Sequence, residues 1–263
     1  MTPENDIAGW DAENLSDDKY LNGRLQIWQP RAGYRAGVDP VLLAAAVNAR
    51  AGQHVLELGC GVGTASLCLG TRVPDLRLTG LEIQADHAAL AMANGRRNGA
   101  DFEVVTGDLM AMPACLKTRQ FDHVIANPPY FDRGASTVSP HPAREMAMGI
   151  AAPLEAWITA AAKRCAPKGY VHVIHRAERL PDLIAAATGV LGSIEVLPLI
   201  PRVGRAAQLV VFRARRGGRA DFRLWDGVVM HKGARHQKDE ESYTDQLVNI
   251  LRHGAALEFS GTG

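Results

Sequence analysis

From about residue 54 onward, apolar runs of strand length alternate with Ala- and Leu-rich stretches of helical length. Short apolar runs of this kind predict strands buried on both faces, and the stretches between them supply the crossovers that parallel strands need. The alternation therefore predicts an α/β chain whose mostly parallel sheet carries helices on both faces. The expected strands are 54–59, 76–83, 102–108, 121–129, 170–176, 193–199 and 208–214, and the expected helices between them are 63–72, 84–98, 154–166 and 178–191.

The last two runs depart from this alternation, because only a short connection with Pro201 and Gly204 separates them. They are expected to pair as an antiparallel hairpin, which gives a Rossmann-like seven-stranded sheet with one inserted antiparallel strand. Small additions are expected at both ends of the chain. These are a hairpin within 22–36, a helix at 38–50, an extra strand pair at 220–231, and a helix at 240–254 that stops at Gly254.

Charge is distributed unevenly along the chain. The 263 residues sum to a net charge of +1, yet residues 1–20 hold six acids against Lys19, a net of −5. Residues 201–238 hold ten Lys and Arg against Asp221 and Asp226, a net of +8. We expect residues 1–20 to be a mobile acidic segment and residues 21–259 to form one domain, with its core at 54–214 and an addition at 220–254. The basic region indicates either a polyanionic partner or an ordinary solvated face.

Several classes of protein are disfavoured. No apolar run approaches the roughly 20 residues of a membrane span, and the acidic start is unlike a signal peptide. The four cysteines lack Cys-x-x-Cys spacing, and no His-Glu-x-x-His is present. His172 and His175 are three residues apart in one expected strand, so they face opposite sides. We therefore expect a cytoplasmic protein without a membrane segment, disulfides or a metal site.

A glycine-rich turn follows the first strand of the core. The run 54–59 leads into Gly59, Cys60, Gly61 and Gly63 and then a helix, which opens backbone amides toward a ligand. The spacing departs from the dinucleotide pattern, and Glu57 lies where a pyrophosphate would be repelled but a cationic group attracted. Other nucleotide-binding sheets also carry a glycine turn, so the turn alone leaves the ligand open.

Carboxylates end the next two strands. Glu82, followed by Ile83, is placed to accept hydrogen bonds from two ribose hydroxyls, and Asp108, followed by Leu109, could hold an adenine amine. Acids at three successive strand ends favour S-adenosylmethionine, whose ammonium and sulfonium are positively charged. The sequence thus predicts a methyl-donor site at the carboxyl edge of the sheet.

The fourth strand ends in Asn127, Pro128, Pro129 and Tyr130, followed by Phe131. Two prolines remove two backbone donors and fix φ, so the segment presents oxygen acceptors rigidly. The Asn127 side-chain oxygen and the Pro128 carbonyl could both accept from one planar amine, while Tyr130 stacks on the flat substrate. This arrangement predicts methylation of an amino nitrogen by direct in-line displacement, without a covalent intermediate or a strong base.

On these motifs, residues 54–214 resemble the class I S-adenosylmethionine-dependent methyltransferases, in the subset whose Asn-Pro-Pro-Tyr motif methylates amino nitrogens. The chain is most similar to the bacterial tRNA (adenine-N6)-methyltransferase group that modifies a valine tRNA beside its anticodon. The narrower resemblance rests on LQIWQPRAGYRAGVDPVLLAA (25–45), Arg144 and Tyr243-Thr244. It implies that Glu57, Gly59, Gly61 and Glu82 bind the cofactor, with Asp108 near its adenine and Asp39 beside it at the pocket entrance. It also implies that Asn127 to Tyr130 bind the target amine, with Asn127 next to the cofactor as well. Glu145-Met146 and the acidic N-terminal extension depart from the group's pattern.

The resemblance implies an RNA partner, and the basic region offers candidate contacts. We expect a phosphate-binding surface formed by Arg144, Arg202, Arg205, Arg213, Arg215 and Arg216, with Arg219 beside them. Other acceptors for the same donor remain open, namely a DNA adenine, a protein glutamine or a small amine. A non-catalytic RNA- or nucleotide-binding module is a third class, which the intact Asn-Pro-Pro-Tyr segment disfavours.

Overall fold

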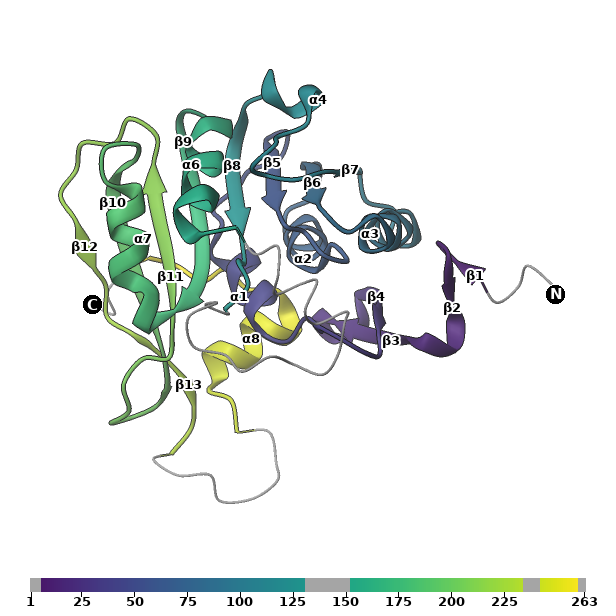
Figure 1. Ribbon diagram of the computed structural model, residues 1–263. Coiled ribbons are helices and arrows are strands. Elements are labelled where there is room, and N and C mark those ends of the chain that lie inside the picture. Colours follow the sequence, from purple (N-terminus) through teal and green to yellow (C-terminus); the bar gives the residue numbers. More distant parts are fainter. Residues whose placement is uncertain (1–5, 131–151, 234–241, 260–263) are drawn as a thin grey trace, which may run out of the picture.

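The computed structural model describes residues 6–130, 152–233 and 242–259 (Figure 1). Its centre is one sheet with the strand order β12-β10-β11-β9-β8-β5-β6-β7, and β13 also pairs with β10. The strands are β5 (His54–Leu58), β6 (Arg77–Glu82), β7 (Phe102–Thr106), β8 (Phe121–Ala126), β9 (Cys165–Arg176), β10 (Gly192–Arg202), β11 (Leu209–Arg215), β12 (Arg223–Leu224) and β13 (Val228–His231). Each of the seven runs predicted from the sequence is a strand of this sheet.

The predicted insertion of an antiparallel strand is confirmed. β11 lies between β9 and β10 and is antiparallel to both, whereas β5 through β9 pair in parallel. The predicted strand pair at 220–231 is wrong in its pairing. β12 and β13 do not pair with each other but follow one another in parallel along the outer edge of β10. They thereby cover part of an edge that would otherwise be open to other chains.

Helices cover both faces of the sheet, because each central strand is buried on both sides. Val124 and Ile125 are neighbours in β8, are both fully buried, and belong to different core clusters on opposite faces. The helices on the Ile125 face are α1 (Asp39–Ala46), α2 (Thr64–Arg72), α3 (Ala85–Arg97) and α8 (Asp245–His253), and those on the Val124 face are α4 (Ala114–Lys117), α6 (Leu154–Arg164) and α7 (Leu180–Ala187). None of the helices within the described ranges combines the length and apolar character of a membrane span.

The predicted C-terminal helix is confirmed as α8, with two end signals that match its sequence. Thr244 caps the N-terminus by accepting a hydrogen bond from the Leu247 amide, and Gly254 ends the helix with φ +69°. Tyr243, beside the cap, stacks on the ring of His231 at 4.7 Å between centroids. The two residues quoted for the resemblance therefore fix the start of α8 against β13.

The expectation that residues 1–20 are mobile and separate is wrong for the second half of that segment. Leu15 and Ser16 are buried, and residues 15–20 form one strand of a hairpin with residues 25–30. The N-terminal elements are β1 (Asp6–Ile7), β2 (Trp10–Asp11), η2 (Ala12–Asn14), β3 (Leu15–Tyr20), η3 (Leu21–Gly23) and β4 (Leu25–Pro30). The acidic composition concealed this strand, because only its two end residues, Leu15 and Tyr20, are apolar.

Asn94 of α3 and Asn98, the residue that caps its C-terminus, bind the free edge of β4. The Asn94 side chain accepts from the Trp28 amide at 2.9 Å and donates to the Trp28 carbonyl at 3.0 Å. The Asn98 side chain does the same for the amide and carbonyl of Gln26, at 3.1 and 2.7 Å. Four helical residues rise about 6 Å, and two strand residues span about 6.7 Å, so the two side chains match two successive outward-facing backbone groups. The helix thus replaces a neighbouring strand.

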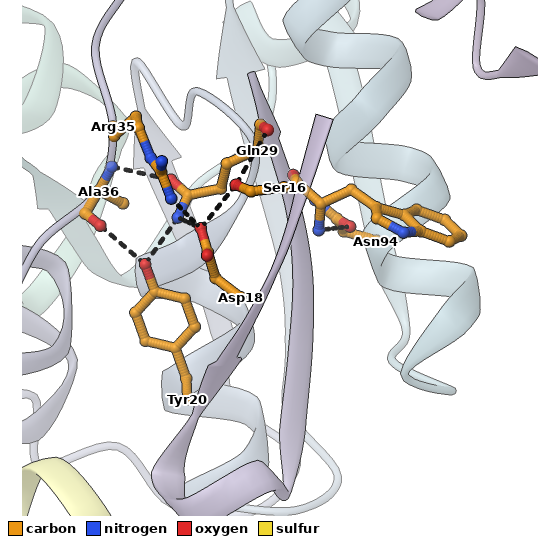
Figure 2. A network of polar contacts seen from close by, with 8 residues as sticks. Ser16, Asp18, Tyr20, Gln29, Arg35, Ala36 and Asn94 are labelled. Atoms are coloured by element: carbon orange, nitrogen blue, oxygen red, sulfur yellow. Dashed lines mark hydrogen bonds and ion pairs between the residues drawn. The ribbon is translucent and has the colours of Figure 1, made fainter. Parts of the chain in front are cut away.

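A network of polar contacts joins the hairpin to the loop that follows it (Figure 2). The buried Gln29 amide donates to the Asp18 carboxylate at 2.7 Å and to the Tyr20 hydroxyl at 2.9 Å. Its oxygen accepts from the Ala36 amide at 2.8 Å, while the Tyr20 hydroxyl donates to the Ala36 carbonyl at 2.8 Å. Arg35 also pairs with Asp18 at 2.7 Å. Residues 31–38 are therefore held to β3 and β4 from both strands.

Replacing the central amide of this network should destabilise the fold. Gln29→Leu leaves the Ala36 amide without its acceptor and removes one of the donors to the Asp18 carboxylate, which should lower the free energy of unfolding by about 1–3 kcal/mol. Urea denaturation followed by circular dichroism measures this change. Lys19→Gln, an exposed change on β3, the strand paired with β4, is the matched control and should stay within about 0.5 kcal/mol of wild type. Equal stability of both variants would contradict the structural role of the network.

Candidate active site

The predicted site residues converge because three parallel strands end level with one another. Leu58, the last residue of β5, is in register with Leu81 of β6 on one side and Ala126 of β8 on the other. The chain leaves these strands through Gly59, Glu82 and Asn127. These three positions are therefore adjacent at the carboxyl edge of the sheet, where ligands of open α/β folds bind.

The turn after β5 requires glycine for two different reasons. A Cβ atom at Gly59 would lie 2.5 Å from the Trp157 ring of α6, so packing against that helix excludes a side chain. Gly61 has φ +54°, a conformation that favours glycine, and a Cβ there would meet nothing within 4 Å. Gly63, with φ +89°, then caps α2. Space is thus left open above Gly61 for a ligand to approach the backbone closely.

The Cys60 side chain packs between this turn and β6. Its thiol is buried, and a Cβ added at Gly80 of β6 would lie 2.6 Å from the Cys60 sulfur. Burial and the neighbouring carboxylates raise the pKa of the thiol well above its ordinary value, so the sulfur stays protonated. Cys60 is one of the residues predicted to bind the cofactor. Because its side chain is buried, it can contact a ligand only through its backbone.

Glu57 holds the start of α2. One carboxylate oxygen accepts from both the amide and the hydroxyl of Ser66, at 2.9 and 2.6 Å. Burial raises the pKa of Glu57 to about 7, with the nearby Glu82 adding to the rise and the Ser66 hydrogen bonds opposing it. A cationic group beside Glu57 would be attracted to the ionised carboxylate, which suits the expected ammonium of the donor.

Glu82 fixes the glycine turn while keeping capacity for a ligand. One of its oxygens accepts from the Gly61 amide at 2.8 Å and the other from the Gln84 amide at 2.9 Å. A carboxylate offers about four lone-pair sites, so roughly two remain for ribose hydroxyls. Ile83, the next residue, keeps 44% of its surface exposed, an apolar face beside this carboxylate.

Asp108 and Leu109 follow β7 in a half-buried turn. One Asp108 carboxylate oxygen accepts from the Met110 amide at 2.8 Å, which orients the side chain. Together with the open turn at Gly61 and the acid at Glu82, this gives acidic and apolar groups suited to a cationic adenosine derivative. The donor set of this edge therefore fits S-adenosylmethionine.

Asn127 lies beside a residue that sequence reasoning missed. The Asn127 side-chain amide donates to the hydroxyl oxygen of Tyr34 at 3.2 Å, although the two residues are 93 positions apart. Tyr34 lies in the loop held by the Gln29 network and keeps 67% of its surface exposed. Pro128 is buried and Pro129 exposed, so the segment is anchored at one proline and open at the next.

Tyr130 is held from two sides. Its hydroxyl donates to the Asp39 carboxylate at 2.5 Å, which places the first residue of α1 beside the Asn-Pro-Pro-Tyr segment. The contact of Asp39 with the cofactor stays a prediction. Burial and the Asp39 charge raise the pKa of Tyr130, so the phenol keeps its proton and remains a donor. The His175 ring packs edge-on against the Tyr130 ring at 5.1 Å between centroids.

His175 is neutral in this position. Its Nδ1 accepts from the Arg176 amide at 2.9 Å, and burial, followed by the charge of Arg179, lowers its pKa to about 4. His172, on the other face of β9, instead contacts His123 at 3.2 Å. Within the described ranges, no three His, Cys, Asp or Glu side chains are grouped as metal ligands.

The arginines predicted to bind RNA do not form one surface. β9 is parallel to β8, so Arg176 ends β9 at the carboxyl edge, and it pairs with Leu209, the first residue of β11. β11 then runs about 20 Å to the opposite edge, where it ends at Arg215. Arg202 and Arg205 are therefore near the active-site edge, and Arg215, Arg216 and Arg219 are near the other. Arg144, like Phe131 and Glu145-Met146, lies outside the described residues.

Four of these guanidinium groups have bonds within the protein. Arg213 pairs with Glu195 at 2.8 Å, and both side chains are mostly buried. Arg202 donates to the Ser242 hydroxyl at 2.9 Å and to the Lys232 carbonyl. Arg215 and Arg216 donate to the carbonyls of Lys168 and Cys165. Arg205 and Arg219 are exposed, so the contact of this group with RNA stays a prediction that is best supported at Arg205.

Arg176 is a further residue that the sequence analysis missed. Its guanidinium carbon lies 5.7 Å from the centre of the Tyr130 ring, and its side chain is half exposed. The rule that parallel strands carry ligands at their carboxyl ends could have identified it, since the strand prediction ended at residue 176. No comparable signal marks Tyr34.

An open α/β sheet with an inserted antiparallel strand, a glycine turn between acids, and Asn-Pro-Pro-Tyr at the same edge defines an S-adenosylmethionine-dependent methyltransferase. The family model described as methyltransferase small domain matches residues 36–181, and the chain belongs to that family.

Curated relatives agree with this assignment, and a solved structure shares the fold. A tRNA1(Val) (adenine(37)-N6)-methyltransferase of Porphyromonas gingivalis is 34% identical over 184 residues, which cover 66% of this chain and 71% of the relative. A ribosomal RNA small subunit methyltransferase C of Cronobacter sakazakii is 31% identical over 130 residues, 49% of this chain and 36% of the relative. The crystal structure of a predicted O-methyltransferase from Agrobacterium tumefaciens has the same fold, with a TM-score of 0.68 at 24% identity over 83% of this chain and 98% of that one.

The raised pKa of Glu57 should make stability depend on pH. The folded protein holds the Glu57 proton up to about pH 7, whereas the unfolded chain releases it near the ordinary value of 4.5. Protonated Glu57 therefore contributes stability that is fully present below pH 4.5 and is lost as the pH rises through 7. Glu57→Gln still accepts from Ser66 but does not titrate. Between pH 5 and pH 8, wild type should lose roughly 1–3 kcal/mol relative to this variant.

Urea unfolding at the two pH values, without donor, measures this difference. Glu13→Gln, at an exposed position, is the control and should follow wild type at both. Parallel pH profiles for wild type and Glu57→Gln would show that Glu57 ionises in the folded protein as it does in the unfolded chain.

Proposed function

We propose that this enzyme methylates the N6 amine of an adenine in tRNA, with S-adenosylmethionine as donor. One observation carries the proposal: Ala126 and Leu58 are in register, so Asn127 lies beside the glycine turn of the donor site. The name of the Porphyromonas gingivalis relative supports tRNA adenine as the acceptor. The proposal places the enzyme in the cytoplasm, together with its substrate.

The donor supplies an electrophilic methyl group on a positively charged sulfur. The protein's part is to hold the acceptor amine in line with that group. An exocyclic amine has two hydrogens, and the Asn127 oxygen and the Pro128 carbonyl are two acceptors from consecutive residues. Accepting both hydrogens draws the nitrogen toward a tetrahedral shape and frees the lone pair for attack.

Tyr130 and Asp39 complete the acceptor pocket. The hydrogen bond to Asp39 and the edge contact with His175 restrict the Tyr130 ring, so a base can stack on it without first ordering it. The amine becomes acidic as it is methylated and then loses a proton. That proton can pass to water, so no strong base is needed, and Tyr130, which is itself protonated and donates to Asp39, does not act as one.

Methyl transfer should depend on the Asn127 side chain. With labelled donor and unmodified tRNA, wild type is expected to give N6-methyladenosine, and Asn127→Ala should lose at least about 100-fold in kcat. Nucleoside mass spectrometry identifies the product, and calorimetry should show that donor binding is retained. Asn48→Ala is the matched control, because Asn48 is exposed and follows the C-terminal end of α1, whereas Asp39 is the first residue of that helix.

The same experiment separates the alternative acceptors. Label in ribosomal RNA in place of tRNA would favour an activity like that named for the Cronobacter sakazakii relative. Label in DNA, in a protein glutamine or in a small amine would replace the acceptor but keep the donor site. Full activity of Asn127→Ala would contradict the mechanism itself.

The position of the arginines predicts which of them bind tRNA. Arg176 and Arg205 lie at the active-site edge, so the double variant Arg176→Gln, Arg205→Gln should weaken tRNA binding and reduce the slope of log affinity against log salt by about 1–2. Arg219→Gln, which removes one charge near the opposite edge, is the control and should keep the wild-type slope. Filter binding at several salt concentrations measures both. A larger loss of tRNA affinity in Arg219→Gln than in the double variant would place the RNA on the opposite edge of the sheet.

A further inference from the structure

We propose that Tyr34 is a positioning residue that sets the orientation of the Asn127 amide, so that its oxygen faces the acceptor amine. This role rests on the proposed function and adds a residue to it. Tyr34 is not part of the Asn-Pro-Pro-Tyr segment or the glycine turn. It reaches the site from the N-terminal hairpin and the loop after it.

The chemistry of an amide makes its orientation decisive. An exocyclic amine that attacks a methyl group offers two N–H donors, so it needs acceptors. The Asn127 side chain carries an acceptor at one end and two donors at the other, and the last torsion of an Asn side chain is broad and roughly two-fold. Only one of the two orientations places oxygen toward the amine. The other places two donors against two donors.

Tyr34 supplies what the productive orientation requires. When the Asn127 oxygen faces the substrate, the amide nitrogen points away and needs an acceptor of its own. The Tyr34 hydroxyl oxygen occupies this position, at 3.2 Å from the nitrogen. Without that hydroxyl, the productive orientation would leave the amide nitrogen without this partner.

The surrounding structure fixes Tyr34 on both sides in the chain. Before it, the Arg31 amide donates to the Asn14 carbonyl at 2.8 Å, and the Arg31 side chain donates to the Glu13 carbonyl at 3.0 Å. After it, Ala36 is held by Gln29 and Tyr20 through two 2.8 Å bonds (Figure 2). The exposed Tyr34 ring is therefore carried by a braced loop.

This bracing gives the N-terminal hairpin a role in catalysis. β3 and β4 form no part of the central sheet, yet their polar side chains determine where the loop 31–38 lies. Asn94 of α3 in turn holds β4. The hairpin thus connects the folded core to the orientation of one amide at the active site.

Removing only the hydroxyl tests the proposal. Tyr34→Phe keeps the ring and should lower kcat about tenfold, the loss expected for one hydrogen bond, with KM for donor and tRNA within twofold of wild type. Tyr170→Phe removes a hydroxyl near the opposite sheet edge and should leave kcat unchanged. An unchanged kcat in Tyr34→Phe would overturn the role of Tyr34.

A second background separates orientation from any other effect of Tyr34. In Asn127→Asp the side chain presents an oxygen in both orientations, so the need for an orienting partner disappears. Adding Tyr34→Phe to this background should cause less than a twofold further loss of kcat, a departure from additivity that measures the coupling. A tenfold loss in both backgrounds would overturn the proposal.

Wild type serves as the reference that keeps the two claims apart. If wild type methylates tRNA adenine and Tyr34→Phe behaves like wild type, only the positioning role fails. If wild type gives no N6-methyladenosine in tRNA, the proposed function fails and the role of Tyr34 in it fails with it.

Discussion

The level ending of the parallel strands is the constraint on which the site depends. Leu58 is in register with both Leu81 and Ala126, so the turns after β5, β6 and β8 emerge side by side. A shift of one residue would reverse the face of every side chain in the strand and separate these turns. The register is itself fixed by burial of both faces of the sheet, since Val124 and Ile125 pack into different cores. Packing of the core thereby aligns the turns proposed to bind the methyl donor with the segment proposed to bind the acceptor amine.

The antiparallel direction of β11 determines where the basic residues of this region lie. A chain segment that is strongly basic in sequence is divided by the direction of one strand, which carries Arg215 away from the active-site edge. Arg213 lies within the sheet and is neutralised by Glu195. Net charge over a segment therefore overstated the basic surface near the site. The cations that remain at the correct edge include Arg176, which that segment does not contain.

The sequence predicted the features that depend on nearby residues. Strand positions, the inserted hairpin, the glycine turn and Asn127 to Tyr130 follow from apolar runs, prolines and glycines, which act locally. Tyr34 was missed because its position depends on Gln29, Asp18 and Tyr20, whose packing no local pattern encodes. Asp39 was found by resemblance alone, since its partner Tyr130 is 91 positions away. The error over residues 15–20 has the same origin, because an acidic composition masked a strand that is stable only when packed.

The central claim is that this carboxyl edge joins a methyl donor to one adenine amine of tRNA. Mass spectrometry of tRNA fragments from cells with and without this protein tests it most directly. The account predicts that one N6-methyladenosine, in a single tRNA loop, disappears in cells that lack the protein and returns when the wild-type chain is restored. An unchanged set of tRNA modifications in those cells would contradict it.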